Sequence, residues 1–135
     1  MDLKLHHINL STDKVAGMSY FYRNILGLKT ETQGLPTLEK EKGYDGDVEF
    51  VSDGYVQTHL AQKDTNVGFR TGQIVNPLER GHIAYRTEDL CAFKAHLDDK
   101  GIPYSDWDET AVTGWKQIFF YDPDGNVIEV HQVTA

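Results

Sequence analysis

The sequence contains a single cysteine, Cys91, among its 135 residues. One cysteine excludes a disulfide within the chain and a thiolate cluster around zinc. Because Cys91 falls inside a helical pattern, we expect it to be a small buried residue with no chemical role.

Long apolar runs and basic clusters are also missing. No stretch approaches the roughly 18 apolar residues of a membrane-spanning helix, and the chain does not start with the basic-then-apolar pattern of a secretory signal. With 13 basic and 21 acidic residues, the net charge is −8, which repels the phosphates of nucleic acids. We therefore expect a cytoplasmic protein that binds neither membranes nor nucleic acids.

What the sequence does contain is the composition of one globular domain, 39% hydrophobic and 25% charged. A chain of this length supports one hydrophobic core. We therefore predict a single domain over residues 1–135, and any duplication has to lie inside it.

Strand and helix patterns occur in the same order in the two halves. In the first half the predicted elements are a strand at 3–10, a helix at 15–27, an extended segment at 28–32, a polar loop at 33–46, and strands at 48–51 and 55–61 around the turn Ser52-Asp53-Gly54. In the second half they are a strand at 81–87, a helix at 90–101, an extended segment at 102–107, and strands at 115–121 and 127–132 around the turn Asp122-Pro123-Asp124-Gly125-Asn126. Each half therefore reads β-α-β-β-β.

Potential metal ligands recur at matching places in these halves. His7 opens the first unit and His82 the second, and each lies 20 or 19 residues before the glycine that ends its helix. His59 and Glu129 lie in the closing strands, 52 and 47 residues after the opening histidines. This internal repeat predicts two modules, about 1–62 and 81–135.

The stretch between the modules, about 63–80, is the linker. Long loops in compact domains are often lids, so the polar segment 62–80 is a candidate lid. A plain polar connection between the modules is an equally good interpretation.

Side chains alternate between the two faces of a strand. His7 and Asn9 therefore point one way, while Ile8 and Leu10 point toward the helix. By the same parity His82 shares a face with Arg86. In the closing strands Gln57 shares a face with His59, and His131 shares one with Glu129.

Two curved modules around a pseudo-twofold axis would bring the opening and closing strands around one cup. Three imidazoles and a carboxylate in that cup, His7, His59, His82 and Glu129, suit a divalent transition metal with positions left for water or substrate. Such a metal acts as a Lewis acid, and it stabilises an enediolate or an oxyanion when it binds two neighbouring substrate oxygens.

Several motifs resemble those of the vicinal oxygen chelate superfamily, which includes glyoxalase I, extradiol dioxygenases and bleomycin resistance proteins. They are Leu5-His6-His7-Ile8-Asn9-Leu10, Phe21-Tyr22-Arg23-Asn24-Ile25-Leu26-Gly27-Leu28, Gly81-His82-Ile83-Ala84-Tyr85 and Phe119-Phe120-Tyr121-Asp122-Pro123-Asp124-Gly125-Asn126-Val127-Ile128-Glu129. The resemblance covers essentially the whole chain. It implies an α+β fold of two βαβββ modules in tandem, whose curved mixed sheet encloses a metal cup, and a homodimer.

The resemblance also implies a ligand set. His7, His82 and Glu129 match the three ligands shared by the metal-using branches. His59 falls where glyoxalase I has a fourth ligand, a glutamate. Gln57 takes that position if the register shifts by two residues, and a role for His59 beside the metal or in substrate binding fits equally well.

Other residues of the site have weaker signals. His6, with the opposite parity, His96, on a helix, and His131, at the cavity edge, are predicted not to be ligands. Phe119, Tyr121, Trp107 and Trp115 suit either a substrate pocket or plain core. Arg86 shares the parity of His82 and is the best candidate to bind a substrate anion.

The leading interpretation is a glyoxalase-type lyase or isomerase that binds a small substrate through vicinal oxygens. Glu129 would be both a ligand and the base that moves a proton at the adjacent carbon. The cofactor is a divalent ion: zinc, nickel, cobalt, manganese or iron. The alternatives are an Fe(II) extradiol-type dioxygenase, using His7, His82 and Glu129 as a two-histidine, one-carboxylate triad, and a protein that binds a small molecule or antibiotic without turnover.

Overall fold

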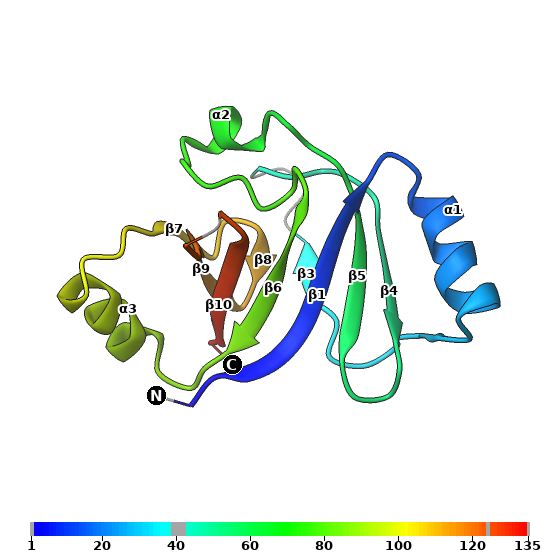
Figure 1. The fold of residues 1–135 in the computed structure, drawn as a ribbon, viewed down its shortest axis with the longest axis horizontal. Coiled ribbons are helices and arrows are strands. Elements are labelled where there is room, and N and C mark those ends of the chain that lie inside the picture. The colour runs from blue at the N-terminus through cyan, green and yellow to red at the C-terminus, as the bar shows by residue number, and fades with distance from the viewer. Residues whose placement is uncertain (1, 39–42, 124, 135) are drawn as a thin grey trace.

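A computed structural model describes residues 2–38, 43–123 and 125–134 as a mixed α+β domain built on one curved sheet (Figure 1). The first-half elements are β1 (Lys4–Thr12), α1 (Val15–Tyr20), the π-helix η1 (Phe21–Ile25), β2 (Lys29–Thr30), β3 (Thr37–Leu38), β4 (Val48–Ser52) and β5 (Gln57–Gln62). Those that follow are α2 (Val67–Thr71), β6 (Gly81–Arg86), α3 (Leu90–Asp99), β7 (Ser105–Asp108), β8 (Val112–Thr113), β9 (Trp115–Tyr121) and β10 (Val127–Val133). The predicted fold class is confirmed.

The strand order of the large sheet is symmetric about its centre. The eight strands run β2-β4-β5-β1-β6-β10-β9-β7, and β3 pairs with β8 in a separate two-stranded sheet. The opening strands β1 and β6 pair antiparallel in the middle. Each also pairs in parallel with the closing strand of its own half, β1 with β5 and β6 with β10. Four neighbouring strands thus carry the residues that the sequence repeat had singled out.

Both predicted hairpins are present, between β4 and β5 and between β9 and β10. In the second turn, Asp122 Oδ1 accepts a hydrogen bond from the Asn126 backbone N–H, whereas Asp124 lies outside the described residues. The helices α1 and α3 lie toward opposite ends of the sheet (Figure 1).

The helix predicted at 15–27 continues from α1 into η1, but its apolar residues are not buried as expected. Phe21 is 47% exposed and Ile25 is 62% exposed, and Ile8, expected to face this helix, is 37% exposed. The first-half helix therefore leaves an apolar surface open.

The second helix packs as its pattern predicts. Leu90, Phe93 and Leu97 form a cluster with Ile118, Phe120 and Val130 from β9 and β10. Cys91 is exposed, so its predicted burial was wrong. It directly follows Leu90, and one helical step turns a side chain away from the buried stripe.

A second cluster lies where the linker meets the cup. Val67, Val75 and Leu78 of the linker are buried against Trp107 and Phe119. The linker contains the short helix α2, so it is a packed wall of the molecule and not a plain polar connection. In the part of the chain that the structure describes, no helix has the length and apolar content needed to cross a membrane.

Candidate metal centre

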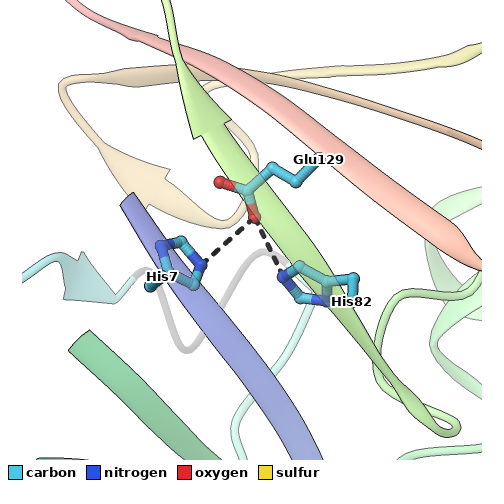
Figure 2. Close-up of side chains that lie close together, drawn as sticks. All are labelled: His7, His82 and Glu129. Carbon is cyan, nitrogen blue, oxygen red and sulfur yellow. Dashed lines mark ion pairs between the residues drawn. The ribbon is translucent and has the colours of Figure 1, made fainter. Parts of the chain in front are cut away.

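Three buried ligand-type side chains converge at the centre of the sheet. Figure 2 shows His7 and His82 pointing at one carboxylate oxygen of Glu129, Oε1. The distance from Oε1 is 3.7 Å to His7 Nε2 and 3.0 Å to His82 Nε2. The three ligand atoms lie within 4.8 Å of one another, and His7, His82 and Glu129 are 2%, 8% and 1% exposed.

Strand pairing explains why these residues meet. Ala84 on β6 is paired with His7 on β1 and with Glu129 on β10. His82 lies two residues before Ala84 and therefore on the same face of β6. Three adjacent strands each contribute one side chain to a single point.

His82 is oriented by the linker. Its Nδ1 lies 2.9 Å from the carbonyl oxygen of Pro77, and a carbonyl only accepts, so Nδ1 carries the proton. The other ring nitrogen of His82, Nε2, faces Glu129 Oε1 at 3.0 Å. The Pro77 contact therefore fixes the ring so that Nε2 points at the buried carboxylate.

The spacing of the three ligand atoms fits a metal ion. Around a tetrahedral zinc with bonds of about 2.0–2.1 Å, neighbouring ligand atoms lie about 3.3 Å apart. The two distances from Glu129 Oε1, 3.0 and 3.7 Å, bracket that value, and all three ligand atoms lie within 4.8 Å of one another. A hydrogen bond from Nδ1 to a carbonyl oxygen, as His82 makes, is also the usual way a ligating imidazole is held.

The ionisation of the site suits a cation as well. Burial alone would raise the pKa of Glu129, but His7 and the hydrogen bond from His131 outweigh it and hold that pKa well below its ordinary value. Burial lowers the pKa of His7, although Glu129 acts in the opposite direction. Metal binding requires a charged carboxylate and neutral imidazoles. The lowered pKa values of Glu129 and His7 favour these forms.

Sequence reasoning missed the role of His131. This residue is 0% exposed, and its Nδ1 donates to Glu129 Oε2 at 2.6 Å. Arg86 Nε donates to His131 Nε2 at 2.9 Å, which fixes the proton on Nδ1. His131 thus holds Glu129 from behind and is not at the cavity edge. The shared parity with Glu129 was the signal that could have found it.

His6 also lies beside the centre, contrary to its predicted parity. The β1–β6 register shifts between Leu5 and His7, and such a bulge breaks the alternation of side chains. His6 Nδ1 is 2.8 Å from His7 Nδ1, and Arg86 lies 3.1 Å from His6 Nε2. Burial and the Arg86 guanidinium lower the pKa of His6 to about 3.

These contacts determine where the proton on His7 sits. Arg86 can only donate, so His6 Nε2 accepts and His6 Nδ1–H donates to His7 Nδ1. The His7 proton is then on Nε2, facing Glu129. For His7 to offer a lone pair there, the hydrogen bond between His6 and His7 has to reverse and Arg86 has to release His6.

His59 occupies the position in the first half that corresponds to Glu129 in the second. Glu129 pairs with Ala84, two residues after His82, and His59 pairs with Asn9, two residues after His7. Gln57 lies two pairs earlier, opposite His7. The register therefore makes His59, and not Gln57, the counterpart of Glu129.

In this structure His59 is close to the centre but outside the three-residue group. Its ring stacks on His7 with centroids 3.8 Å apart, and its Nε2 lies 2.7 Å from Gln57 Oε1. Burial, followed by the influence of His7, lowers the pKa of His59 well below its ordinary value.

The centre opens into a cavity of about 60 Å³. His7, His59, His82, Glu129 and Phe119 line it. Trp107 and Trp115 line it as well, whereas Arg86, Gln57 and Tyr121 do not. Arg86 is bonded to His131 and His6, Gln57 contacts His59 and the backbone of Gln33, and Tyr121 is 47% exposed.

Comparison with known proteins agrees with this fold. The family model described as "Glyoxalase/Bleomycin resistance protein/Dioxygenase superfamily" matches residues 4–130. No curated protein matches the chain.

Solved structures of the same architecture cover nearly the whole chain. A hypothetical protein from Bacillus halodurans C-125 is 17% identical with a TM-score of 0.70, over 98% of this chain and 95% of that one. A variant of Streptomyces coelicolor methylmalonyl-CoA epimerase, in complex with 2-nitronate-propionyl-CoA, is 20% identical with a TM-score of 0.67, over 99% and 100%. A superfamily member from Vibrio splendidus 12B01 is 12% identical with a TM-score of 0.59, over 97% and 99%.

Proposed function

Since this chain belongs to the Glyoxalase/Bleomycin resistance protein/Dioxygenase superfamily, we propose that it is a divalent-metal-dependent enzyme. We propose further that it is a lyase or isomerase of glyoxalase type, acting on a small substrate with vicinal oxygens. The observation that carries this proposal is the convergence of His7, His82 and Glu129, three buried side chains whose ligand atoms lie within 4.8 Å of one another.

In this proposal His7, His82 and Glu129 hold the metal, and His59 supplies a fourth ligand. His59 lines the same cavity, stacks on His7 and has the register position that corresponds to Glu129. When bound, a zinc, nickel, cobalt, manganese or iron ion supplies Lewis acidity to the two substrate oxygens.

Glu129 is also the proposed base. One carboxylate oxygen, Oε1, faces the two imidazoles, while Oε2 accepts the hydrogen bond from His131. The hydrogen bond from His131 orients the carboxylate. An oriented carboxylate can take a proton from the substrate carbon next to the two vicinal oxygens and return it. Phe119, which lines the cavity and contacts His82 edge-on at 5.4 Å, bounds the space for that substrate.

An Fe(II) dioxygenase is the second candidate, and one observation favours it. The described residues bring together two histidines and one carboxylate, whereas His59 Nε2 is engaged by Gln57. A two-histidine, one-carboxylate set with open positions is typical of non-haem Fe(II) oxygenases. A binding protein without turnover is less well supported, because the ligand set is intact.

We also propose a cytoplasmic homodimer. Exposed apolar side chains gather on α1, on η1 and at the residue that follows η1, where Tyr20, Phe21, Ile25 and Leu26 are 47–62% exposed. Such a surface is a candidate contact between subunits, and light scattering on the purified protein measures the oligomeric state directly.

The two enzyme proposals separate in one experiment. The protein loaded with Zn²⁺ and with Fe²⁺ is incubated in D₂O with an α-hydroxyketone, and deuterium entering at the carbon beside the carbonyl is followed by NMR. Exchange that is lost in Glu129→Gln supports the lyase or isomerase. No exchange, with oxygen consumed in the presence of a catechol by the Fe²⁺ form, overturns it in favour of the dioxygenase.

A further inference from the structure

Three residues that line the cavity each carry a buried polar group with no hydrogen-bond partner among the residues the structure describes. They are the amide oxygens of Asn9 and Gln117 and the indole N–H of Trp107. These residues are only 7%, 5% and 1% exposed. Leaving a buried polar group without a partner is costly. These three polar groups belong to residues around one cavity, so a molecule that enters it, water or ligand, is their available hydrogen-bond partner.

The three groups approach the metal centre from different strands. Asn9 on β1 pairs with His59 on one side and His82 on the other. Gln117 on β9 pairs with His131. A ligand beside the metal centre thus meets polar groups contributed by both halves of the sheet.

Trp107 lies at an irregularity of strand pairing. The β7–β9 register shifts between Asp106 and Asp108, and Asp108 has a φ of 49°. Asp is one of the residues other than glycine that adopt this left-handed conformation most often. Trp107 lies within this irregularity and lines the cavity. Its ring contacts Phe119 edge-on, with centroids 5.3 Å apart.

The remaining walls are mainly apolar and aromatic. Phe50, Trp115 and Phe119 line the cavity, and no lysine or arginine is among its described lining residues. Arg86 is bonded to His131 and His6 behind the centre. A carboxylate or phosphate on the body of a substrate would therefore find no cationic side chain among these residues.

We propose that the cavity takes an uncharged α-hydroxycarbonyl compound with a planar, largely apolar body. This substrate class rests on the proposed function, in which the metal chelates the two vicinal oxygens. The substrate hydroxyl donates to the amide oxygen of Asn9 or Gln117, and Trp107 Nε1–H donates to a substrate oxygen. Aromatic walls contact the planar body.

The test measures binding to the Zn²⁺-loaded protein by calorimetry with two probes. Phenacyl alcohol carries the neighbouring carbonyl and hydroxyl on a phenyl ring, and its para-carboxy derivative adds only a charge. We expect phenacyl alcohol to bind at least about tenfold more tightly, because the carboxylate is desolvated without a partner.

Variants of the polar groups test their role. Trp107→Phe and Gln117→Leu are each expected to weaken phenacyl alcohol binding about tenfold with Zn²⁺ affinity unchanged. Gln117→Leu is also expected to keep or raise the melting temperature of the free protein, since it removes a buried group without a partner. Ser11→Ala is the matched control, because Ser11 Oγ is also buried without a partner but lies outside the cavity lining.

The outcomes distinguish the two levels of the proposal. The substrate class is overturned if the two probes bind with equal affinity, or if both variants bind phenacyl alcohol as the unaltered protein does. In either case, Zn²⁺ binding by the unaltered protein still supports the proposed function. Failure of the unaltered protein to bind a divalent metal overturns both.

Discussion

His131 donates a hydrogen bond from Nδ1 to Glu129 Oε2 at 2.6 Å, two residues away on the same strand. Both side chains are fully buried, and Arg86 holds the other nitrogen of the His131 ring. One oxygen of Glu129 is thereby fixed, which leaves the other for the metal.

Removing this hydrogen bond is expected to weaken metal binding. His131→Phe keeps a ring to stack on Trp115, now 4.2 Å away, but loses the donor, and losing such a supporting contact typically costs about 10–100-fold in metal affinity. Competition with a chelator measures the change. His131→Asn, whose amide N–H can replace Nδ1–H, should recover part of the affinity, and His96→Asn on α3 should have no effect. Equal loss in the Phe and Asn variants would contradict a role for the hydrogen bond.

His59 and Gln57 can be separated by substitution. If His59 is the fourth ligand, His59→Ala lowers the affinity for Zn²⁺ by at least about tenfold, whereas Gln57→Ala has a smaller effect through the orientation of His59. The same chelator competition measures both. Unchanged zinc affinity in His59→Ala would leave a three-ligand centre and favour the dioxygenase.

Gly81 permits the close approach of β6 to β1 next to the metal centre. Its φ is +128°, and a Cβ at this position would overlap the carbonyl oxygen of Asn9. Gly81→Ala is therefore expected to lower the free energy of unfolding by more than about 2 kcal/mol. Gly54→Ala is the control, because Gly54 also has a positive φ but open space around it, so it should cost only about 1 kcal/mol. Urea denaturation of both variants gives the comparison, and equal losses would show that backbone strain alone accounts for the effect.

The linker is tied down by an ion pair whose contribution depends on pH. Arg70 on α2 bonds to Asp64 and to the carbonyl oxygen of Gly43. The hydrogen bond from Arg70 lowers the pKa of Asp64 below its ordinary value of 3.8. A depressed pKa contributes stability above the unfolded-state value, and this contribution is lost as the pH falls through the folded-state value.

The stability difference between the unaltered protein and Asp64→Asn should therefore be constant near neutral pH and shrink below pH 3.8. Thermal unfolding over a pH series measures it, and salt at about 1 M should reduce the difference at neutral pH because the pair is partly exposed. A difference that grew as the pH fell would contradict this account.

The sequence predicted the order of elements because strand and helix periodicities repeat in both halves. It also predicted that His7, His59, His82 and Glu129 would gather in one cup, since they occupy two matching pairs of places in the repeat. The structure brings the ligand atoms of His7, His82 and Glu129 together and leaves His59 stacked on His7. It could not predict the contacts of His6, because strand alternation assumes regular pairing and the bulge before His7 breaks it. Nor does a local pattern show which histidine hydrogen bonds to which carboxylate, as at His131. The burial of the linker depends on packing against β7 and β9, which lie far along the chain.

The metal content of the purified protein tests the central claim most directly. Elemental analysis of protein prepared without tag or chelator should find about one divalent transition metal ion per chain, lost in His82→Ala and in Glu129→Gln while His96→Asn retains it. Addition of metal to the stripped protein should raise the melting temperature. At a free metal concentration 100 times Kd, the free energy of unfolding should increase by about 2.7 kcal/mol. Absence of metal from the unaltered protein, with no stabilisation on its addition, would contradict a metal centre at these residues.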